Sequence, residues 1–196
     1  MRILVIGATG TIGREVVAAL GGEHEVLAAS RKAGELAVDI RDPGSIRALF
    51  GRVGELDAVV SCAGGAAWKP LADLTDEDFA LSLRNKLMGQ VNVVRHGFDS
   101  VRSGGSLTIT SGILARTAMP SSAAVSLVNA GLEGFTRAAA LEAPRRIRVN
   151  VVSPPWVTET LLALKMDPSQ GKPAAEVARA YVRSVEGTES GQVIEP

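Results

Sequence analysis

Apolar and polar positions change their spacing along the chain in a regular alternation. Short runs rich in β-branched and apolar residues are followed by longer segments in which apolar residues recur with a helical period. This alternation is typical of strand–helix–strand units and predicts a mostly parallel sheet with helices packed on it. Six or seven strands are expected, over residues 2–6, 25–29, 36–38, 58–61, 106–110, 147–152 and, as a last short strand, 192–194.

Local signals mark the ends of the helices between these strands. Gly21-Gly22 stops the first helix, because glycine is favoured at the end of a helix and disfavoured inside it. The run from Thr75 to Asp78 predicts a capping box, in which two side chains three residues apart bind each other's backbone amides. The expected helices cover residues 11–20, 43–50, 76–101, 121–141 and 174–185.

Three glycines follow the first expected strand at intervals of three residues, where strand turns into helix. A pyrophosphate has to come close to the backbone amides at the start of a helix, and side chains at these turns would block it. An ordinary strand–helix turn can carry the same glycines, but the position between strand and helix favours a dinucleotide. The residues expected to hold it are Gly7, Thr9, Gly10, Thr11, Ile12 and Gly13.

The type of dinucleotide is decided at the end of the second expected strand. A carboxylate there accepts hydrogen bonds from the free ribose of NAD(H), whereas a cation neutralises the 2′-phosphate of NADP(H). This chain has Ser30-Arg31-Lys32 at that point and no acidic residue. An arginine holds a phosphate through a fork of donors, so Ser30 and Arg31 favour NADP(H). The alternative is that Arg31 and Lys32 are solvated residues of a turn.

The composition narrows the range of functions. The chain has 196 residues, of which 46% are hydrophobic, so one packed core and a single domain over residues 1–196 are expected. Its 21 basic and 21 acidic residues cancel, which leaves no net field to attract nucleic acid or an anionic membrane surface.

Compartment and metal content are also constrained. A single cysteine cannot form an intrachain disulfide, and the sequence begins directly with a strand pattern in place of a signal peptide. No apolar run approaches the roughly 20 residues of a bilayer span. We therefore expect a cytoplasmic protein without a membrane segment. No group of His, Cys or acidic residues has metal-ligand spacing, so no metal is expected.

Further short motifs follow one another in a fixed order. They are Asp39-Ile40, Ser61-Cys62-Ala63-Gly64, Leu74-Thr75-Asp76-Glu77-Asp78-Phe79, Leu132-Glu133-Gly134-Phe135-Thr136, Ile147-Arg148-Val149-Asn150-Val151-Val152-Ser153-Pro154 and Gly191-Gln192-Val193. In this order and spacing the chain resembles the short-chain dehydrogenase/reductase family. The resemblance implies a Rossmann fold, a doubly wound parallel sheet in a three-layer α/β/α arrangement.

The resemblance implies more contacts with the dinucleotide. Asp39 and Ile40 would touch the adenine, while Cys62, Ala63 and Gly64 would line the adenosine ribose.

The loop beside the nicotinamide departs from the family's Pro-Gly and reads Pro154-Pro155. In this loop the backbone of Val157 would meet the carboxamide, and Thr158 or Thr160 the phosphates. A second proline removes a backbone donor and fixes its own φ, so a stiffer loop is expected. The segment after it is shorter than a typical substrate lid, which predicts a small or open substrate site.

The family's catalytic tyrosine and lysine are both replaced. In the family the tyrosine gives the proton, and a lysine four residues later lowers the tyrosine's pKa; general acid catalysis of this kind is worth roughly 10² to 10⁴ in rate. Counting back from the motif at residues 132–135 puts Val125 in the tyrosine position and Asn129 in the lysine position. Valine cannot donate a proton.

The other two catalytic positions also differ. The serine position falls on Gly112, and the neighbouring Ser111 substitutes for it only if the strand register shifts by one. The position of the family's asparagine holds Lys86. Lysine and asparagine with their positions exchanged are similar to the ketoreductase domains of polyketide synthases, which also resemble this family. Those domains keep the tyrosine that this chain lacks.

Each of these residues has two interpretations. A lysine on a helix is usually solvated, but a buried Lys86 beside the nicotinamide would have a pKa lowered towards neutrality and would replace the missing acid. Ser111 and Asn129 are either structural hydrogen-bonding groups or catalysts. Trp68 and Trp156 are expected at the mouth of the cleft, where packing is their usual role.

Two functions remain open. The first is an NADP(H)-dependent oxidoreductase that acts on a small carbonyl or alcohol substrate through Lys86, Ser111 and Asn129. The second is a catalytically inactive NADP(H)-binding protein that reports cofactor level or redox state to a partner. Family resemblance also implies a homodimer or homotetramer, paired through the helices near residues 76–101 and 121–141.

Overall fold

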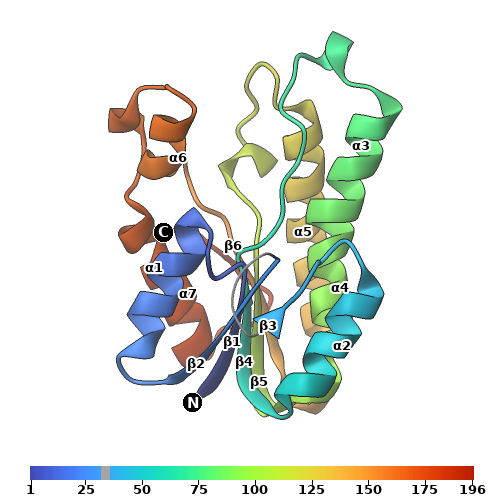
Figure 1. Ribbon diagram of the computed structural model, residues 1–196, viewed down its shortest axis with the longest axis vertical. Helices are drawn as coiled ribbons and strands as arrows, with labels where there is room; N and C mark the ends of the chain where they lie inside the picture. Colours follow the sequence, from blue (N-terminus) through green and yellow to red (C-terminus); the bar gives the residue numbers. More distant parts are fainter. Residues whose placement is uncertain (32–35) are drawn as a thin grey trace.

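Seven parallel strands form one sheet in the computed structural model, which describes residues 1–31 and 36–196. Lys32, named above beside Arg31, lies outside the described residues. The strand order is β3-β2-β1-β4-β5-β6-β7, which confirms the doubly wound sheet (Figure 1). The strands are β1 (Arg2–Ile6), β2 (Glu25–Ser30), β3 (Leu36–Ala37), β4 (Leu56–Ser61), β5 (Val101–Thr110), β6 (Arg148–Val152) and β7 (Val193–Ile194).

Helices cover both faces of this sheet and complete three layers (Figure 1). One face packs against α1 and α7, and the other against α2, α4 and α5. The α-helices are α1 (Thr11–Gly21), α2 (Pro43–Val53), α3 (Asp76–Ser82), α4 (Met88–Gly97), α5 (Ala123–Glu142), α6 (Thr158–Ala163) and α7 (Ala174–Glu186).

Strand β1 shows why its residues form a central strand. Ile3 and Val5 pack into the cluster under α1 and α7, while Leu4 and Ile6 pack into the cluster on the opposite face. All four side chains are 0% exposed. Successive side chains of a strand point to opposite faces, so a run that is apolar at every position is stable only when both faces are covered. Burying each of these side chains contributes about 1.5–3 kcal/mol.

The order of the strands determines at which edge of the sheet a ligand-binding crevice can form. The chain moves outward from β1 to β2 and β3, and then returns to β4 on the other side of β1. Ile6 pairs with both Ala29 and Ser61, so the carboxyl ends of β1, β2 and β4 meet at one place. A crevice forms where neighbouring connections leave in opposite directions, and open α/β sheets bind their ligands there.

The helical stretch expected over residues 76–101 is present from Asp76 to Ser100, and it contains one π-helical turn that the sequence pattern did not indicate. The capping box at Thr75 and Asp78 is present and starts α3. After α3 comes a π-helical turn over Leu83–Leu87, and only then does α4 begin. A π turn holds one residue more than an α turn, so it changes the direction of the side chains it contains. Lys86 lies in this turn.

Two other boundaries differ from the sequence pattern. Strand β5 begins at Val101, because Val101 pairs with Leu56 before the register shifts. The six-residue helix α6 follows the loop at residues 154–157 and was not predicted. Within the part of the chain that the structure describes, no helix is both long enough and apolar enough to cross a membrane.

Candidate functional site

A cavity of about 360 Å³ opens at the carboxyl ends of β1, β2 and β4. Ten of the residues predicted to bind the dinucleotide line it, together with Ile6, Val38, Gly65 and Asn85, which the sequence pattern did not single out. The ten are Gly7, Thr9, Gly10, Ser30, Arg31, Asp39, Ile40, Cys62, Ala63 and Gly64. Motifs far apart in the sequence therefore meet in one cavity.

The glycines of the first loop are required by close backbone contacts. Gly7 has a φ of 84°, and a Cβ on it would lie 2.9 Å from the Ala63 nitrogen. A Cβ on Gly13 would lie 2.1 Å from the carbonyl oxygen of Gly7. Gly10 is the N-cap of α1 and provides no side chain to bind the first amides of the helix. The glycine turn thus packs against backbone atoms on one side and leaves the first amides of α1 for an anion on the other.

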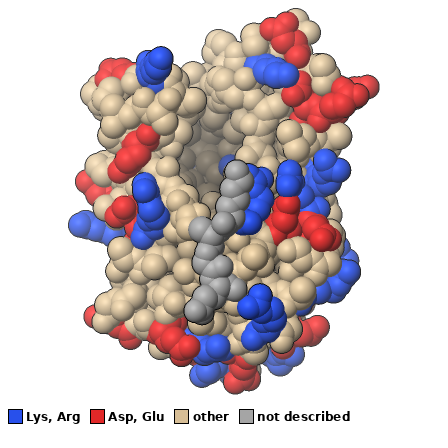
Figure 2. Space-filling view, viewed as in Figure 1, with Lys and Arg blue, Asp and Glu red and all other residues tan. Residues whose placement is uncertain are grey.

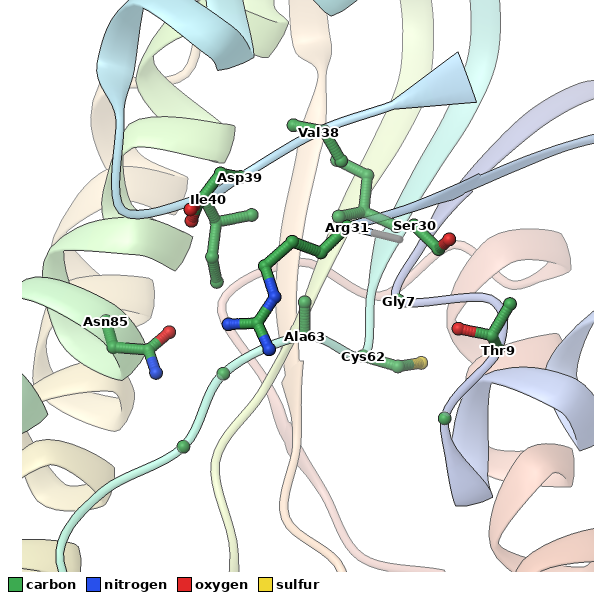
Figure 3. A pocket seen from close by; sticks show the side chains of 14 residues that line it. Gly7, Thr9, Ser30, Arg31, Val38, Asp39, Ile40, Cys62, Ala63 and Asn85 are labelled. Carbon is green, nitrogen blue, oxygen red and sulfur yellow. The ribbon is translucent and has the colours of Figure 1, made fainter. Parts of the chain in front are cut away.

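Arg31 lies against this cavity from the end of β2. Figure 3 shows its side chain running into the cavity, with the guanidinium between Ala63 and Asn85. Ile40 lies beside it in the same view. The cation therefore faces the space that the glycine loop borders, which is the arrangement expected of a phosphate ligand.

The Asp39 carboxylate lies in the same lining as Arg31, but it is paired with a different cation, Arg41. Arg41 donates to the Asp39 carboxylate from Nε at 2.9 Å and from its backbone amide at 3.0 Å. The side-chain bond from Arg41, with a smaller contribution from Arg31, lowers the pKa of Asp39 to about 2. Asp39 is therefore an ionised residue whose charge is balanced by Arg41.

A second cavity of about 210 Å³ adjoins the first, and the two share Cys62 and Gly64 in their linings. All three predicted catalytic residues line it. Figure 2 shows a hollow between the part of the molecule carrying α6 and the helices α3 and α5, with mostly uncharged surface inside. The lining residues are Ile12, Cys62, Gly64, Lys86, Thr110, Ser111, Gly112, Ile113, Leu114, Asn129, Pro154, Pro155, Trp156, Val157 and Thr160.

Lys86 is the basic residue of this second lining. Its ammonium donates a hydrogen bond to the carbonyl oxygen of Ser111 at 3.0 Å. The residue keeps some exposed surface, yet the surrounding protein removes enough water to lower the pKa of Lys86 to about 8. Gly64 makes room for it, since a Cβ at Gly64 would lie 3.2 Å from the Lys86 Cα. Lys86 is thus a desolvated cation at the cavity.

Asn129 approaches the same strand end from α5. Its Nδ2 is 3.4 Å from the Gly112 carbonyl oxygen, and the residue is 2% exposed. Its Oδ1 has no hydrogen-bond partner among the described residues. A Cβ on Gly112 would lie 3.0 Å from Nδ2. Lys86 and Asn129 are therefore both held by consecutive carbonyls, those of Ser111 and Gly112.

The carbonyl and the hydroxyl of Ser111 have different partners: the carbonyl binds Lys86, and the hydroxyl binds Glu133. The Ser111 Oγ donates to Oε1 of Glu133 on α5 at 3.1 Å. Glu133 entered the sequence interpretation only as part of a helix motif. A charged residue in an otherwise apolar stretch of helix was the available signal for it, and that signal does not name its partners.

The single tyrosine of the chain lies outside both linings. Tyr181 is on α7, is 0% exposed, and shares a 2.7 Å hydrogen bond with the Thr110 hydroxyl. Burial raises the pKa of Tyr181 well above its usual value and raises the pKa of the neighbouring Cys62 to about 12. Among the described residues that line the cavities, none is a tyrosine.

Two tryptophans contact each other beside the second cavity. The rings of Trp68 and Trp156 pack edge to face, with centroids 5.6 Å apart and an interplanar angle of 76°. Trp156 belongs to the lining, and Trp68 is 39% exposed. The pair joins the segment after β4 to the segment after β6 across the cleft.

Three predicted cofactor residues do not line either cavity. Thr11 is the first residue of α1. Gly13 packs closely against the Gly7 backbone. Thr158 bonds through its backbone amide to the Lys172 carbonyl, whereas Thr160 is in the second lining. The structure thus favours Thr160 over Thr158 as a group facing the cavity.

The tertiary structure also gathers three possible metal ligands that sequence spacing did not reveal. Ligand atoms of Glu23, His24 and Glu186 lie within 4.8 Å of one another. The His24 Nε2 is 3.0 Å from a Glu186 carboxylate oxygen, which links the end of α1 to the end of α7. None of the three belongs to either cavity.

Comparison with known proteins identifies relatives across nearly the whole chain. A family model described as enoyl-(acyl carrier protein) reductase matches residues 12–194. Hydroxynaphthalene reductase arp2 of Aspergillus fumigatus is 32% identical over 137 residues, which are 67% of this chain and 50% of that protein. The chain thus spans about half the length of the curated relatives that it matches.

Solved structures match over the full length. The protein lin1944 from Listeria innocua is 39% identical, with a TM-score of 0.96 and coverage of 100% of this chain and 98% of that one. A small-chain dehydrogenase in complex with NADPH is 28% identical, with a TM-score of 0.88 and coverage of 100% and 96%.

Proposed function

Because this chain belongs to the short-chain dehydrogenase/reductase family, we propose that it binds NADP(H) in the two joined cavities and interconverts a small carbonyl compound and its alcohol. The bound nicotinamide supplies or accepts the hydride. The observation that carries the proposal is the meeting of the glycine loop, Arg31 and Lys86 along one continuous cleft. The complex of a 28% identical relative with NADPH supports the choice of cofactor.

The residues of the first cavity fit a phosphorylated dinucleotide. The packed glycines leave helix amides for a pyrophosphate, and side chains at Gly7 and Gly13 would destroy that surface. Arg31 is the basic residue among the described residues of this lining. A guanidinium there favours the 2′-phosphate of NADP(H) over the free ribose of NAD(H).

The second cavity provides a proton donor at Lys86. With a pKa of about 8, the Nζ group is about nine-tenths protonated at pH 7 and is a stronger acid than an ordinary lysine. One of its protons is engaged by the Ser111 carbonyl, which leaves others for a substrate oxygen. Asn129 helps to shape the same wall. In this proposal Lys86 protonates the substrate oxygen, and Asn129 and Ser111 position the groups around it.

A specific observation also favours the second candidate, an NADP(H)-binding protein without turnover. The described residues that line the cleft include no tyrosine, and the only tyrosine of the chain is buried on α7. A protein of this kind would keep the phosphate cradle and report cofactor level through its surface. Both candidates require the same cofactor site, so binding and turnover have to be measured separately.

Cofactor selection is tested by calorimetric titration of NADPH and NADH. Wild type is expected to prefer NADPH, and Arg31→Ala to lose about tenfold or more of that preference, because one charged hydrogen-bonded contact contributes about 1.5–3 kcal/mol. Arg47→Ala, which removes an exposed arginine from α2, is the matched control. Equal affinity of wild type for the two cofactors would refute the assignment of NADP(H).

Turnover is tested by NADPH oxidation over a panel of aldehydes, ketones and quinones. If Lys86 is the acid, Lys86→Met abolishes turnover and leaves NADPH binding within about twofold. The control is Lys165→Met, at an exposed lysine after α6. Turnover that survives in Lys86→Met excludes this role of Lys86, and silence of wild type across the panel favours the binding protein.

A further inference from the structure

A buried carboxylate lies behind the second cavity. Glu133 on α5 is 5% exposed, and its Oε1 accepts hydrogen bonds from the hydroxyls of Ser111 and Ser153, both at 3.1 Å. The Nε of Arg116 lies 3.6 Å from Oε2. A buried charge is costly unless it is paired and hydrogen-bonded, and here two hydroxyls and a guanidinium meet that need.

The two serines hold equivalent places on neighbouring strands. Ser111 directly follows β5, and Ser153 directly follows β6. The Ser111 amide donates to the Val152 carbonyl at 2.8 Å, and the Ser153 amide donates to the Ile194 carbonyl at 2.9 Å. One carboxylate oxygen therefore joins two adjacent strand ends at the edge of the sheet where the cavities open.

Both serines are directly connected to residues that line the second cavity. The carbonyl of Ser111 accepts the hydrogen bond from the Lys86 ammonium at 3.0 Å. Ser153 precedes Pro154, a lining residue whose carbonyl accepts from the Ile113 amide at 2.8 Å. A movement of either hydroxyl would therefore be transmitted to atoms that face the second cavity.

Arg116 closes the network from the solvent side. Its Nη2 donates to the Ser153 hydroxyl at 3.1 Å, and its Nη1 pairs with the Glu195 carboxylate. Glu195, and to a lesser degree Glu133, raise the pKa of Arg116. Arg116 thus balances the buried charge and ties it to the segment after β7.

We propose that Glu133 is a positioning residue for the second cavity. By binding the Ser111 hydroxyl, Glu133 turns that hydroxyl away from the cavity and fixes the Ser111 carbonyl, which accepts the hydrogen bond from Lys86. By binding the Ser153 hydroxyl, Glu133 fixes the start of the loop at residues 154–157. The role given to Lys86 in turnover rests on the proposed function, but the contacts of Glu133 do not. An apolar side chain would fill the same helix face and would leave both hydroxyls free to turn.

The test measures the titration of Lys86 directly. The chain has five lysines, so carbon-13 methylation of the amines gives few NMR signals, and Lys86→Arg assigns the one of interest. In Glu133→Ala the Ser111 carbonyl loses its tether and the amine gains water. The titration midpoint of Lys86 is therefore expected to rise by about half a pKa unit or more.

Three further variants separate positioning from a general loss of structure. Glu133→Gln keeps the shape and one acceptor, so a smaller rise is expected. Ser111→Ala cuts the same tether from the other end and should give a rise of the same sign. The double variant Glu133→Ala/Ser111→Ala should give no more than the larger single effect, because both changes break one path. Glu142→Ala, an exposed carboxylate at the end of α5, is the control and should leave the midpoint unchanged.

The proposal is overturned if the Lys86 midpoint stays at its wild-type value in folded Glu133→Gln and Ser111→Ala. Additive effects of Glu133→Ala and Ser111→Ala overturn it as well. If Glu133→Ala does not fold, the other two single variants decide. This readout requires neither NADPH nor turnover, so a wild type without turnover would refute the proposed function and leave the test of Glu133 intact.

Discussion

Removal of the Lys86 charge should stabilise the protein while it destroys the proposed acid. Burial lowers the pKa of Lys86 from 10.5 to about 8. One pKa unit corresponds to about 1.4 kcal/mol, so holding the ammonium in the folded state costs about 3 kcal/mol relative to the unfolded chain. Lys86→Met removes that cost but leaves the Ser111 carbonyl without its donor, a loss of about 1 kcal/mol. A net gain of about 2 kcal/mol is expected at pH 7.

The sign of the pH dependence follows from the same shift. The folded-state pKa is below the unfolded-state pKa, so between about pH 8 and pH 10.5 the unfolded chain binds more protons at this site. The cost is complete below about pH 8 and disappears as the pH rises to 10.5. The stability advantage of Lys86→Met over wild type should therefore shrink steadily across that window.

Urea unfolding at a series of pH values from 7 to 10 measures this difference. The side chains of Tyr181 and Cys62, whose pKa values are raised in the folded protein, are present in both proteins, so their contributions cancel in the difference. Lys165→Met, at an exposed lysine, should show no such trend. A difference between wild type and Lys86→Met that stays constant from pH 7 to pH 10 would show that the Lys86 ammonium is not desolvated.

The other predictions concern the glycine turn after β1, Val125 and the thiol of Cys62. Gly13→Ala should destabilise the fold by about 2 kcal/mol or more and abolish NADPH binding, because the new Cβ would meet the Gly7 carbonyl at 2.1 Å; thermal unfolding and calorimetry report the two effects. Val125→Tyr alone should not give high turnover, because Asn129 lacks the charge that lowers a tyrosine pKa, and rapid NADPH oxidation by that single variant would contradict this. Cys62, with a pKa of about 12, should resist alkylation at pH 8, and labelling at the rate of an ordinary free thiol would show that the pKa of the thiol is not raised.

Much of the fold was accessible from the sequence, because it rests on local patterns. Strand β1 was predicted at its observed bounds, since Ile3 to Ile6 form an unbroken apolar run and a glycine follows at once. Apolar runs located the other strands and a period of about 3.6 residues located most helices, although β5 begins well before its predicted start at residue 106. The π turn at Leu83–Leu87 carried no such signal, so the predicted helical stretch included these residues without indicating the turn.

The lining of the first cavity was predicted from the sequence to a similar extent. The carboxyl ends of parallel strands come together by topology, so motifs placed just after β1, β2 and β4 had to be neighbours. Ten predicted residues do share one lining. The expected homodimer or homotetramer stays a prediction.

The sequence by itself determined the parallel sheet and the glycines between β1 and α1, because each depends on residue type and spacing along the chain. Only the tertiary structure decided that Ser111 turns its hydroxyl to Glu133 and its carbonyl to Lys86. Those contacts join residues 22 and 25 positions apart. Their geometry depends on how α5 and the π turn pack against the end of β5, which no local pattern encodes.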